Sequence, residues 1–264
     1  MVLDRIVKGA ECWAKGAGLS IWREIRQKVQ RRGRTFVALL LPRDCMLCGG
    51  HSGEHFLCEP CEAALPPLTN AHCRVCAQPL PGLDVNASLP CGRCLAHPPN
   101  FDATIARYVY EFPVDEVIQA LKYQHRLASA HFLGNALIAA LPADKPDVIV
   151  PVPLSVERLA ERGFNQSLEI AKPLARHLGV AINTDALQRV RHTLPQVQLP
   201  WKERANNIRH AFVGTQGLDQ QHVWVVDDVM TTGATLNEIA GALKASGAAR
   251  VTNVVVARAI KRQG

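Results

Sequence analysis

A pair of acidic residues followed by threonines and a glycine is the part of the sequence best suited to chemistry. Asp227 and Asp228 follow the apolar run 223–226, and residues 230–235 are Met-Thr-Thr-Gly-Ala-Thr. Backbone N–H groups and threonine hydroxyls in such a turn bind anions, above all where a helix begins. Carboxylates would repel a phosphate beside them, but they suit ribose hydroxyls or a bound Mg²⁺. The segment therefore predicts a site for a phosphorylated pentose. An acidic cap on an ordinary helix is the alternative.

Cysteines supply a second kind of chemistry. Eight of the nine form four C-x-x-C pairs, which are Cys45 with Cys48, Cys58 with Cys61, Cys73 with Cys76, and Cys91 with Cys94. Each pair fits a tight turn that directs two thiolates at one ion, and two such turns complete a tetrahedron around Zn²⁺. Because sulfur occupies every ligand position, both sites are expected to be structural. Sequential pairing is the simplest scheme, and an interleaved one, first pair with third and second with fourth, also fits the spacing.

Other uses of these cysteines agree less well with their arrangement. Disulfides are rare in a reducing cytoplasm, and a redox C-x-x-C normally occurs once, close to a β-α-β unit. Iron–sulfur clusters take the same ligands but usually show a denser run of cysteines. Glycine and proline residues around the four pairs favour the irregular turns of a zinc ribbon. Zinc is therefore the expected metal, with two ions per chain.

From residue 101 onward, strand-like and helix-like segments alternate. Strands are expected at 104–112, 147–153, 223–226 and 251–257, and helices at 114–123, at 128–140, after residue 153 up to residue 178, and at 234–245. This alternation predicts an α/β fold, a mainly parallel sheet flanked by helices on both faces. Ligands of such sheets bind at the carboxyl ends of the strands. The acidic pair would lie at that edge.

The amino-terminal segment 1–44 carries most of the net charge of +7. Ten Lys and Arg residues lie there against four acidic residues. Ile21, Trp22, Ile25 and Val29 form one face of a predicted helix, and basic residues cover the rest. Such an arm is attracted to nucleic acid or to an acidic lipid surface, and packing on its own protein is the equal alternative.

Two kinds of targeting segment are missing from the sequence. No apolar run approaches the ~20 residues that a membrane-spanning helix needs. No secretory signal is recognisable in the first 30 residues, which never build an apolar core region. A cytoplasmic protein without a transmembrane segment is therefore expected.

Further motifs accompany the acidic pair upstream. They are Val150-Pro-Val-Pro-Leu154, Arg158, Arg162-Gly-Phe-Asn-Gln166, Arg191-His-Thr-Leu-Pro-Gln196 and Arg204-Ala-Asn-Asn-Ile-Arg-His-Ala-Phe212. The acidic pair with its threonines resembles the motif of type I phosphoribosyltransferases, and the whole set resembles the ComF family. In that family a cysteine-rich zinc segment precedes a phosphoribosyltransferase-like domain. We therefore expect a basic helical arm at 1–44, a double zinc ribbon at 45–97 and a phosphoribosyltransferase-like domain at 101–264.

The resemblance also implies a role for each matching residue. Asp227 and Asp228 would hold the ribose hydroxyls with Mg²⁺ nearby, and the 5-phosphate would lie on Met230, Thr231, Thr232, Gly233, Ala234 and Thr235. The pyrophosphate would face Pro151, Val152 and Pro153, with Arg158 and Arg162 as partners, because guanidinium groups match phosphate oxygens. Residues 193–204 would form a flap that closes over the ligand. The alternative for residues 162–166 is that they form only a connecting loop.

Two functions follow from the resemblance. ComF-like proteins are associated with natural transformation, which implies a protein that binds phosphoribosyl pyrophosphate with Mg²⁺ and handles internalised single-stranded DNA. Its partners would be that sugar phosphate or a relative, single-stranded DNA and DNA-uptake proteins. The alternative is an active phosphoribosyltransferase of nucleotide metabolism with an unidentified acceptor. Residues 101–123 show no recognisable base-binding pattern, and no residue stands out as a general acid or base.

Overall fold

The computed structural model describes residues 44–68, 71–84, 89–190, 211–215 and 217–260. The chain separates into two compact units, residues 1–61 and 62–264, so the boundary lies between the second and third C-x-x-C pairs. The first unit contains the described residues 44–61 and the start of the short helix α3 (Glu59–Ala63). The second unit contains the other two pairs and all the strands of both sheets.

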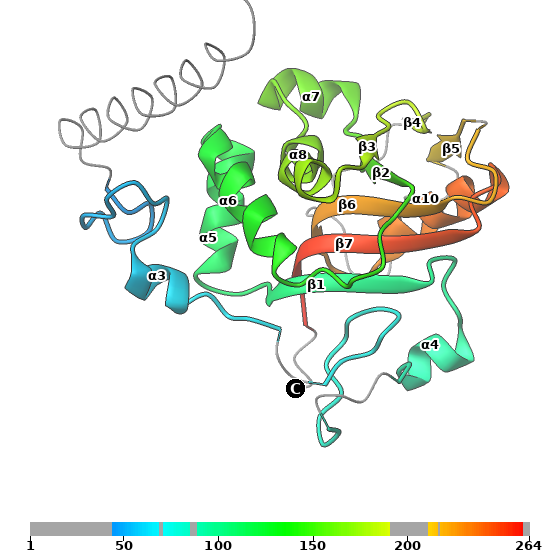
Figure 1. The fold of residues 1–264 in the computed structure, drawn as a ribbon, viewed down its shortest axis with the longest axis horizontal. Helices are drawn as coiled ribbons and strands as arrows, with labels where there is room; N and C mark the ends of the chain where they lie inside the picture. Colours follow the sequence, from blue (N-terminus) through cyan, green and yellow to red (C-terminus); the bar gives the residue numbers. More distant parts are fainter. Residues whose placement is uncertain (1–43, 69–70, 85–88, 191–210, 216, 261–264) are drawn as a thin grey trace, which may run out of the picture. The chain divides into compact units, whose positions relative to one another are not determined.

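A five-stranded sheet forms the centre of the second unit (Figure 1). Its order is β1-β7-β6-β2-β3, and every neighbouring pair of strands is parallel. The strands are β1 (Ala103–Val109), β2 (Val148–Pro151), β3 (Ala181–Ile182), β6 (His222–Met230) and β7 (Arg250–Arg258). Because β6 is the middle strand, its carboxyl end lies at the centre of the edge where ligands of such sheets bind.

Burial explains the apolar character of the central strands. All four residues of β2 are buried, and so are all but the first residue of β7. A parallel sheet that is covered on both faces has strands that are apolar nearly throughout, in contrast to an alternating pattern. Trp224 on β6 is 0% exposed and heads the set of large side chains in the core.

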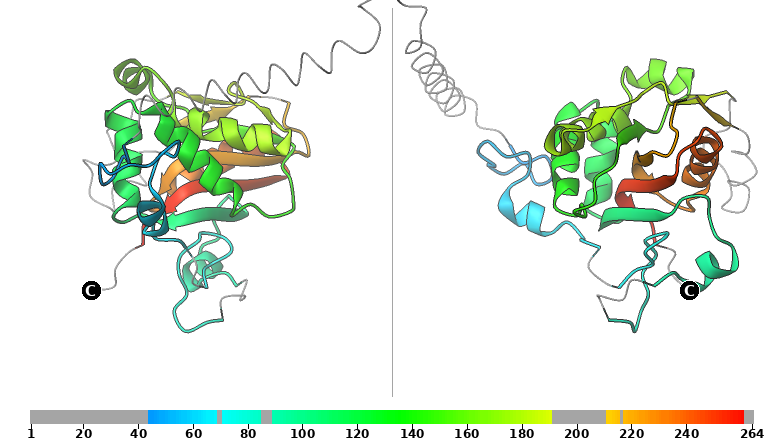
Figure 2. Two further views of the ribbon diagram at one scale, coloured as in Figure 1. Left: turned by 60° about the vertical axis from the view of Figure 1, so that its left-hand side comes forward. Right: turned by 45° about the vertical axis from the view of Figure 1, so that its right-hand side comes forward.

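Helices cover both faces of this sheet. α5 (Val114–Tyr123), α6 (Leu127–Ile138) and α8 (Gln166–Leu178) lie on one face and α10 (Ala234–Ala245) lies on the other, as Figures 1 and 2 show. The shorter helices are α4 (Gly92–Ala96) and α7 (Val156–Arg162). A second sheet pairs β4 (Leu187–Arg189) antiparallel with β5 (Phe212–Gly214), and both of its strands contact α10.

The predicted fold class is confirmed, but several elements differ from their predicted form. β1 was expected to reach residue 112 but ends at Val109, β2 was expected at 147–153 but spans 148–151, and the short strands β3, β4 and β5 were not predicted. β6 was expected to end at residue 226, but it continues through Asp227, which pairs with Val255 of β7, and reaches Met230. One helix was expected between residues 153 and 178, whereas the chain forms α7 and α8. Gly163 ends α7 with a left-handed φ of 70°, which breaks the helix. α8 ends at Leu178, the predicted end, and Gly179 follows it with a left-handed φ of 69°.

Two of the expectations fall on residues that the structure does not describe. They are the amphipathic helix within residues 1–43 and the flap at 193–204. Within the described ranges, no helix is both long enough and apolar enough to cross a lipid bilayer.

Candidate functional site

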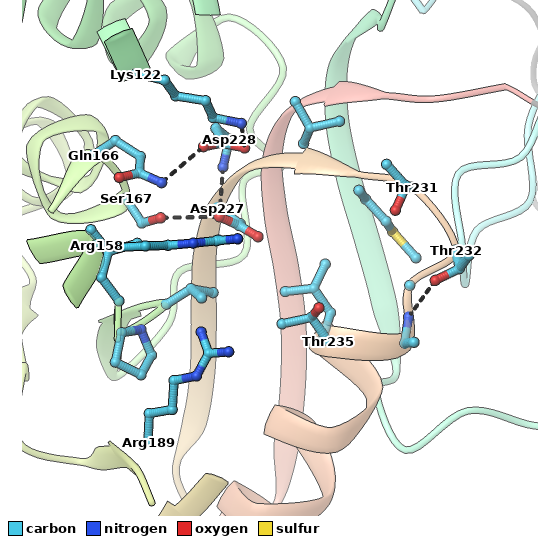
Figure 3. Close-up of a pocket in the computed structure, with 18 of the residues that line it drawn as sticks. Lys122, Arg158, Gln166, Ser167, Arg189, Asp227, Asp228, Thr231, Thr232 and Thr235 are labelled. Carbon is cyan, nitrogen blue, oxygen red and sulfur yellow. Dashed lines mark hydrogen bonds and ion pairs between the residues drawn. The ribbon is translucent and has the colours of Figure 1, made fainter. Parts of the chain in front are cut away.

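A cavity of about 370 Å³ opens at the carboxyl end of β6 (Figure 3). Its walls come from the end of β6, from residues 230–235, which we name the threonine loop, from α7 and the start of α8, and from the end of α5. The volume lies in the range of about 300–1,000 Å³ that is usual for small-molecule sites. Segments that are far apart in the sequence therefore form one site at the expected edge of the sheet.

Helical side chains hold each carboxylate of the acidic pair. Ser167 Oγ donates a hydrogen bond to Asp227 Oδ1 at 3.0 Å, and Gln166 Nε2 donates one to Asp228 Oδ2 at 3.3 Å. Lys122 Nζ, at the end of α5, forms an ion pair with Asp228 Oδ1 at 2.8 Å. Figure 3 shows the other oxygen of Asp227 pointing away from Ser167 into the cavity. The pair therefore has a fixed orientation and presents a carboxylate oxygen to a ligand.

Burial and charge set the protonation of these groups. Burial, and then the charge of Asp228, raise the pKa of Asp227 to about 7, against the opposing effects of Lys122 and Ser167. Burial by itself lowers the pKa of Lys122, but the charge and the hydrogen bond of Asp228 outweigh it and raise the pKa above its ordinary value. Asp227 therefore exchanges its proton near neutral pH beside a charged lysine. A carboxyl in this state can accept or donate a hydrogen bond, and both suit hydroxyl groups.

The threonine loop turns the chain from β6 into α10. Gly233 directly precedes α10 with a φ of 82°, a conformation that glycine adopts without strain. A Cβ on Gly233 would lie 2.5 Å from Cε of Met230, the end of a flexible side chain that would have to move. Thr232 Oγ1 accepts a hydrogen bond from the N–H of Ala234 at 3.1 Å. The loop thus presents the amino terminus of a helix to the cavity, an arrangement that binds anions.

Guanidinium groups also line the cavity, where Figure 3 shows Arg158 and Arg189 as sticks. Burial lowers the pKa of Arg189, and the charge of Arg158 lowers it further, so the two cations repel each other. Arg162 is only 8% exposed, and its Nε and Nη1 have no hydrogen-bond partner among the described residues. The guanidinium of Arg162 lies 5.5 Å from the ring centroid of Tyr123. A buried cation without an acidic partner is unfavourable, so this side of the cavity suits an anion.

The Arg-Gly-Phe-Asn-Gln motif at 162–166 connects the two sides of the cavity. Arg162 is the last residue of α7, and Asn165 caps the start of α8 by accepting hydrogen bonds from the N–H groups of Ser167 and Leu168. Asn165 Nδ2 also donates to the carbonyl of Val152 at 3.0 Å, and the next residue, Gln166, bonds to Asp228. The motif is therefore more than a connecting loop, because it joins the loop after β2 to the acidic pair.

Most of the predicted site residues lie in this one cavity. Both aspartates, the whole threonine loop, Val152, Pro153, Arg158 and Arg162 line it. Pro151 does not line the cavity, because it is the last residue of β2 and is buried in the sheet. The roles of all these predicted site residues toward a ligand stay predictions.

Several lining residues were not predicted from the sequence, among them Tyr110, Lys122, Ser167 and Arg189. Lys122 lies 106 positions from Asp228, and no local pattern connects the two. Ser167 follows the 162–166 motif directly, so its place at the start of a capped helix was a usable signal. Arg189 belongs to a strand too short to be predicted from periodicity.

The eight paired cysteines form two groups of four. The first cysteine site consists of Cys45, Cys48, Cys58 and Cys61, and the second of Cys73, Cys76, Cys91 and Cys94. Within each site all sulfur atoms lie within 4.8 Å of one another. Of the two pairings that the spacing allowed, the structure has the sequential one. Backbone N–H groups support the sulfurs, as where Cys91 N donates to Cys73 Sγ at 3.1 Å.

Four sulfurs at this spacing fit a cation that prefers tetrahedral thiolate ligands. A hydrogen bond with Cys58, and then burial, raise the pKa of Cys61 to about 12, because crowded thiolates disfavour one another. In the second site burial opposes ionisation of Cys73, but hydrogen bonds from the N–H groups of Cys76 and Cys91 lower its pKa to about 7. A dication relieves this repulsion, and four sulfur ligands are the usual set of structural zinc. The residues of both sites therefore fit zinc.

Comparison with known proteins gives two family models and a group of relatives. A double zinc ribbon domain matches residues 36–95, and a phosphoribosyl transferase domain matches residues 164–264. DNA utilization protein YhgH of Salmonella typhimurium is 36% identical over 228 residues, which cover 81% of this chain and 96% of that protein. Competence protein F of Haemophilus influenzae is 31% identical over 227 residues, with the same two shares. The chain belongs to the ComF family.

The ComF assignment agrees with the order of the parts along the chain. The zinc ribbon match spans both cysteine sites, although the boundary between the two structural units lies between them. Among solved structures, glutamine phosphoribosylpyrophosphate amidotransferase from B. subtilis aligns with a TM-score of 0.34 and 22% identity, covering 48% of this chain and 25% of that one. A structural similarity this low indicates nothing about the ligand of the ComF protein.

Proposed function

We propose that this ComF protein binds phosphoribosyl pyrophosphate, or a closely related sugar phosphate, together with Mg²⁺. One observation carries the proposal. The oriented acidic pair, the threonine loop and the buried guanidinium of Arg162 line the same cavity. Carboxylates suit hydroxyl groups, a helix amino terminus suits a phosphate, and a buried guanidinium suits a second anionic group. Phosphoribosyl pyrophosphate is a pentose with a phosphate at one end, hydroxyl groups on the ring and a pyrophosphate at the other end. Its groups therefore match these three parts of the cavity.

The charges suggest how the ligand and its metal ion divide the site. Asp227 and Asp228 would hold the ribose hydroxyls, the threonine loop the 5-phosphate, and Arg158 with Arg162 the pyrophosphate. Carboxylate oxygens are ligands for Mg²⁺, but Lys122 already pairs with Asp228 Oδ1. We therefore expect the phosphate oxygens of the sugar phosphate to supply most of the Mg²⁺ ligands.

Calorimetric titration with phosphoribosyl pyrophosphate and Mg²⁺ tests this proposal. The wild-type protein is expected to bind, and the double variant Asp227→Asn with Asp228→Asn is expected to lose binding. Asp144→Asn is the matched control, because Asp144 is an exposed acidic residue that pairs with Arg250 away from the cavity. Equal binding by the double variant and the wild type would overturn the assignment.

We further propose that the protein handles internalised single-stranded DNA. The names of the relatives, DNA utilization protein and competence protein, support this link. The basic segment 1–44 supplies charges that suit a phosphate backbone. Removing residues 1–43 is expected to reduce the salt dependence of single-strand binding, by about 0.7 in the logarithmic slope for each phosphate that the arm neutralises. An unchanged slope would exclude the arm from DNA binding.

An active phosphoribosyltransferase is the second candidate. The raised pKa of Asp227 favours it, because a carboxyl that titrates near neutral pH is able to accept a proton from an attacking acceptor. Release of pyrophosphate in the presence of a nucleobase, ammonia or anthranilate would support transfer. Tight binding of phosphoribosyl pyrophosphate without release in any of these mixtures would support the binding module.

A further inference from the structure

The threonine loop is connected to the second cysteine site by a buried arginine. Arg258, the last residue of β7, is 3% exposed. Its Nε donates a hydrogen bond to the carbonyl of Cys76 at 2.8 Å, and its Nη2 donates to Gln78 Oε1 at 3.3 Å. Its Nη1 lies within hydrogen-bond distance of the carbonyls of Met230, at 3.0 Å, of Thr231 and of Ala259, which share its two N–H groups. One guanidinium thus holds both the cysteine turn and the start of the loop.

A second arginine makes the same connection from another turn of the site. Arg93 lies in α4 between Cys91 and Cys94, and its Nη2 donates to the carbonyl of Thr232 at 3.2 Å. Three consecutive carbonyls of the loop, those of residues 230, 231 and 232, are therefore bonded to arginines that belong to, or contact, the second cysteine site.

The direction of these carbonyls decides what the loop can bind. A trans peptide is planar, so its N–H points opposite to its carbonyl. Carbonyl dipoles that face an anion repel it, whereas N–H groups attract it. When Arg258 and Arg93 hold the carbonyls of residues 230–232 on the side of the cysteines, the N–H groups of residues 231–233 are turned to the opposite side. This is the orientation that a phosphate requires.

Apolar packing makes the connection rigid. Cys73, Cys76 and Cys94 belong to the same buried cluster as Met230 and Leu236, which lie at either end of the threonine loop. Displacing the cysteine turns would therefore disturb both the hydrogen bonds and the packing that support the loop.

We propose that the second cysteine site positions the threonine loop through Arg258 and Arg93, so that the affinity of the loop for phosphate depends on this site being intact. Arg258 and Arg93 are positioning residues, because they act on the loop backbone from the side of the cysteines. The part of the inference that concerns affinity rests on the proposed sugar-phosphate site. The part that concerns the loop conformation does not.

The test compares Arg258→Lys and Arg93→Ala in the full-length chain. Arg258→Lys keeps the charge but cannot reach all the carbonyls with one planar fork. Amide hydrogen exchange of residues 230–236, measured without ligand, is expected to speed up at least tenfold in Arg258→Lys and by a smaller factor in Arg93→Ala. Affinity for ribose 5-phosphate, measured by calorimetry, is expected to fall at least tenfold in Arg258→Lys. Zinc bound per chain is expected to stay as in the wild type.

Arg250→Lys is the matched control, because Arg250 begins the same strand and pairs with the exposed Asp144. It should leave exchange, affinity and zinc content unchanged. If the amide hydrogens of residues 230–236 exchange as slowly in both Arg258→Lys and Arg93→Ala as in the wild type, the inference is overturned. If Arg258→Lys does not fold, Arg93→Ala, which replaces an exposed side chain, provides the test by itself. Faster exchange in a series where the wild type itself does not bind ribose 5-phosphate would support the positioning role and count against the proposed function.

Discussion

Asp227 has a pKa of about 7 because burial and the neighbouring Asp228 disfavour its charge. The ordinary pKa is 3.8, so between about pH 4 and about pH 7 the unfolded chain has lost a proton that the folded protein still holds. The contribution of Asp227 to stability is therefore fully present below the pKa of the unfolded chain, and it is lost as the pH rises through the pKa of the folded protein. Placing this carboxyl in the site therefore lowers stability near neutral pH.

Asp227→Asn is expected to remove this pH dependence. The free energy of unfolding of the wild type, minus that of the variant, should fall as the pH rises from about 4 to about 8, by an amount on the order of 4 kcal/mol at ~1.4 kcal/mol per pKa unit. Urea unfolding of both proteins over this range measures the difference, in which the titration of groups that do not interact with Asp227 cancels. A difference that stays constant with pH would show that Asp227 titrates normally.

Lys122→Met is expected to destabilise the protein by about 3 kcal/mol, because it leaves the buried carboxylate of Asp228 without its cationic partner. Lys172→Met is the matched control, since Lys172 pairs with Glu169 on the surface of α8 and such pairs contribute less than about 1 kcal/mol. Denaturant unfolding at neutral pH compares the two variants. Equal costs would mean that the Lys122–Asp228 pair is screened like a surface pair.

At the scale of elements, the turn between β6 and α10 decides the geometry of the site. β6 carries the acidic pair to the edge of the sheet, and Gly233 then starts α10 in a left-handed conformation. The 162–166 motif does the same for the opposite wall by ending α7 and capping α8. Short breaks between regular elements, and not the elements themselves, therefore aim the polar groups at the cavity.

Gly233→Ala tests the requirement for this turn. Alanine at a positive φ costs about 1–2 kcal/mol wherever it is placed, but at Gly233 this strain falls on the threonine loop itself, and the new Cβ would also have to displace the terminal methyl group of Met230. Gly179→Ala shares the backbone cost away from the cavity, because Gly179 lies at the end of α8 and a Cβ added there would have no neighbour within 4 Å. Ribose 5-phosphate affinity is expected to fall at least tenfold in Gly233→Ala alone. Equal affinities in the two variants would show that the loop tolerates a side chain.

At the scale of the whole molecule, the two cysteine sites belong to different units. The second site shares a buried cluster with the threonine loop and α10, so it is part of the core of the sheet-containing unit. The first site lies in the unit that ends at Cys61. Sites of the same chemistry therefore stabilise different parts of the protein.

Replacing the cysteines of each site in turn should separate these contributions. Cys73→Ser with Cys76→Ser is expected to lower both the melting temperature of the sheet-containing unit and the affinity for ribose 5-phosphate, the latter at least tenfold. Cys45→Ser with Cys48→Ser is expected to leave that affinity within about twofold, because the arginines that bond to the loop belong to, or contact, the second site. Equal losses of affinity in both double variants would contradict this division.

Local patterns in the sequence determined the fold class, the ligands of the cysteine sites and most of the cavity lining. These features depend on neighbours in the chain: apolar runs build buried strands, C-x-x-C builds a metal-binding turn, and a Thr/Gly run after a strand builds an anion-binding loop. The left-handed Gly179 at the end of α8 was predictable for the same reason.

Only the tertiary structure decided which distant residues meet. Lys122 reaches Asp228 across 106 positions, and Arg258 reaches Cys76 across 182, with no pattern in the intervening sequence to indicate either interaction. The sequential pairing of cysteines was likewise decided by folding, because the spacing allowed two schemes. These contacts depend on the order of the strands and on the direction of each helix. Both are selected by the packing of the whole core, and no single segment encodes them.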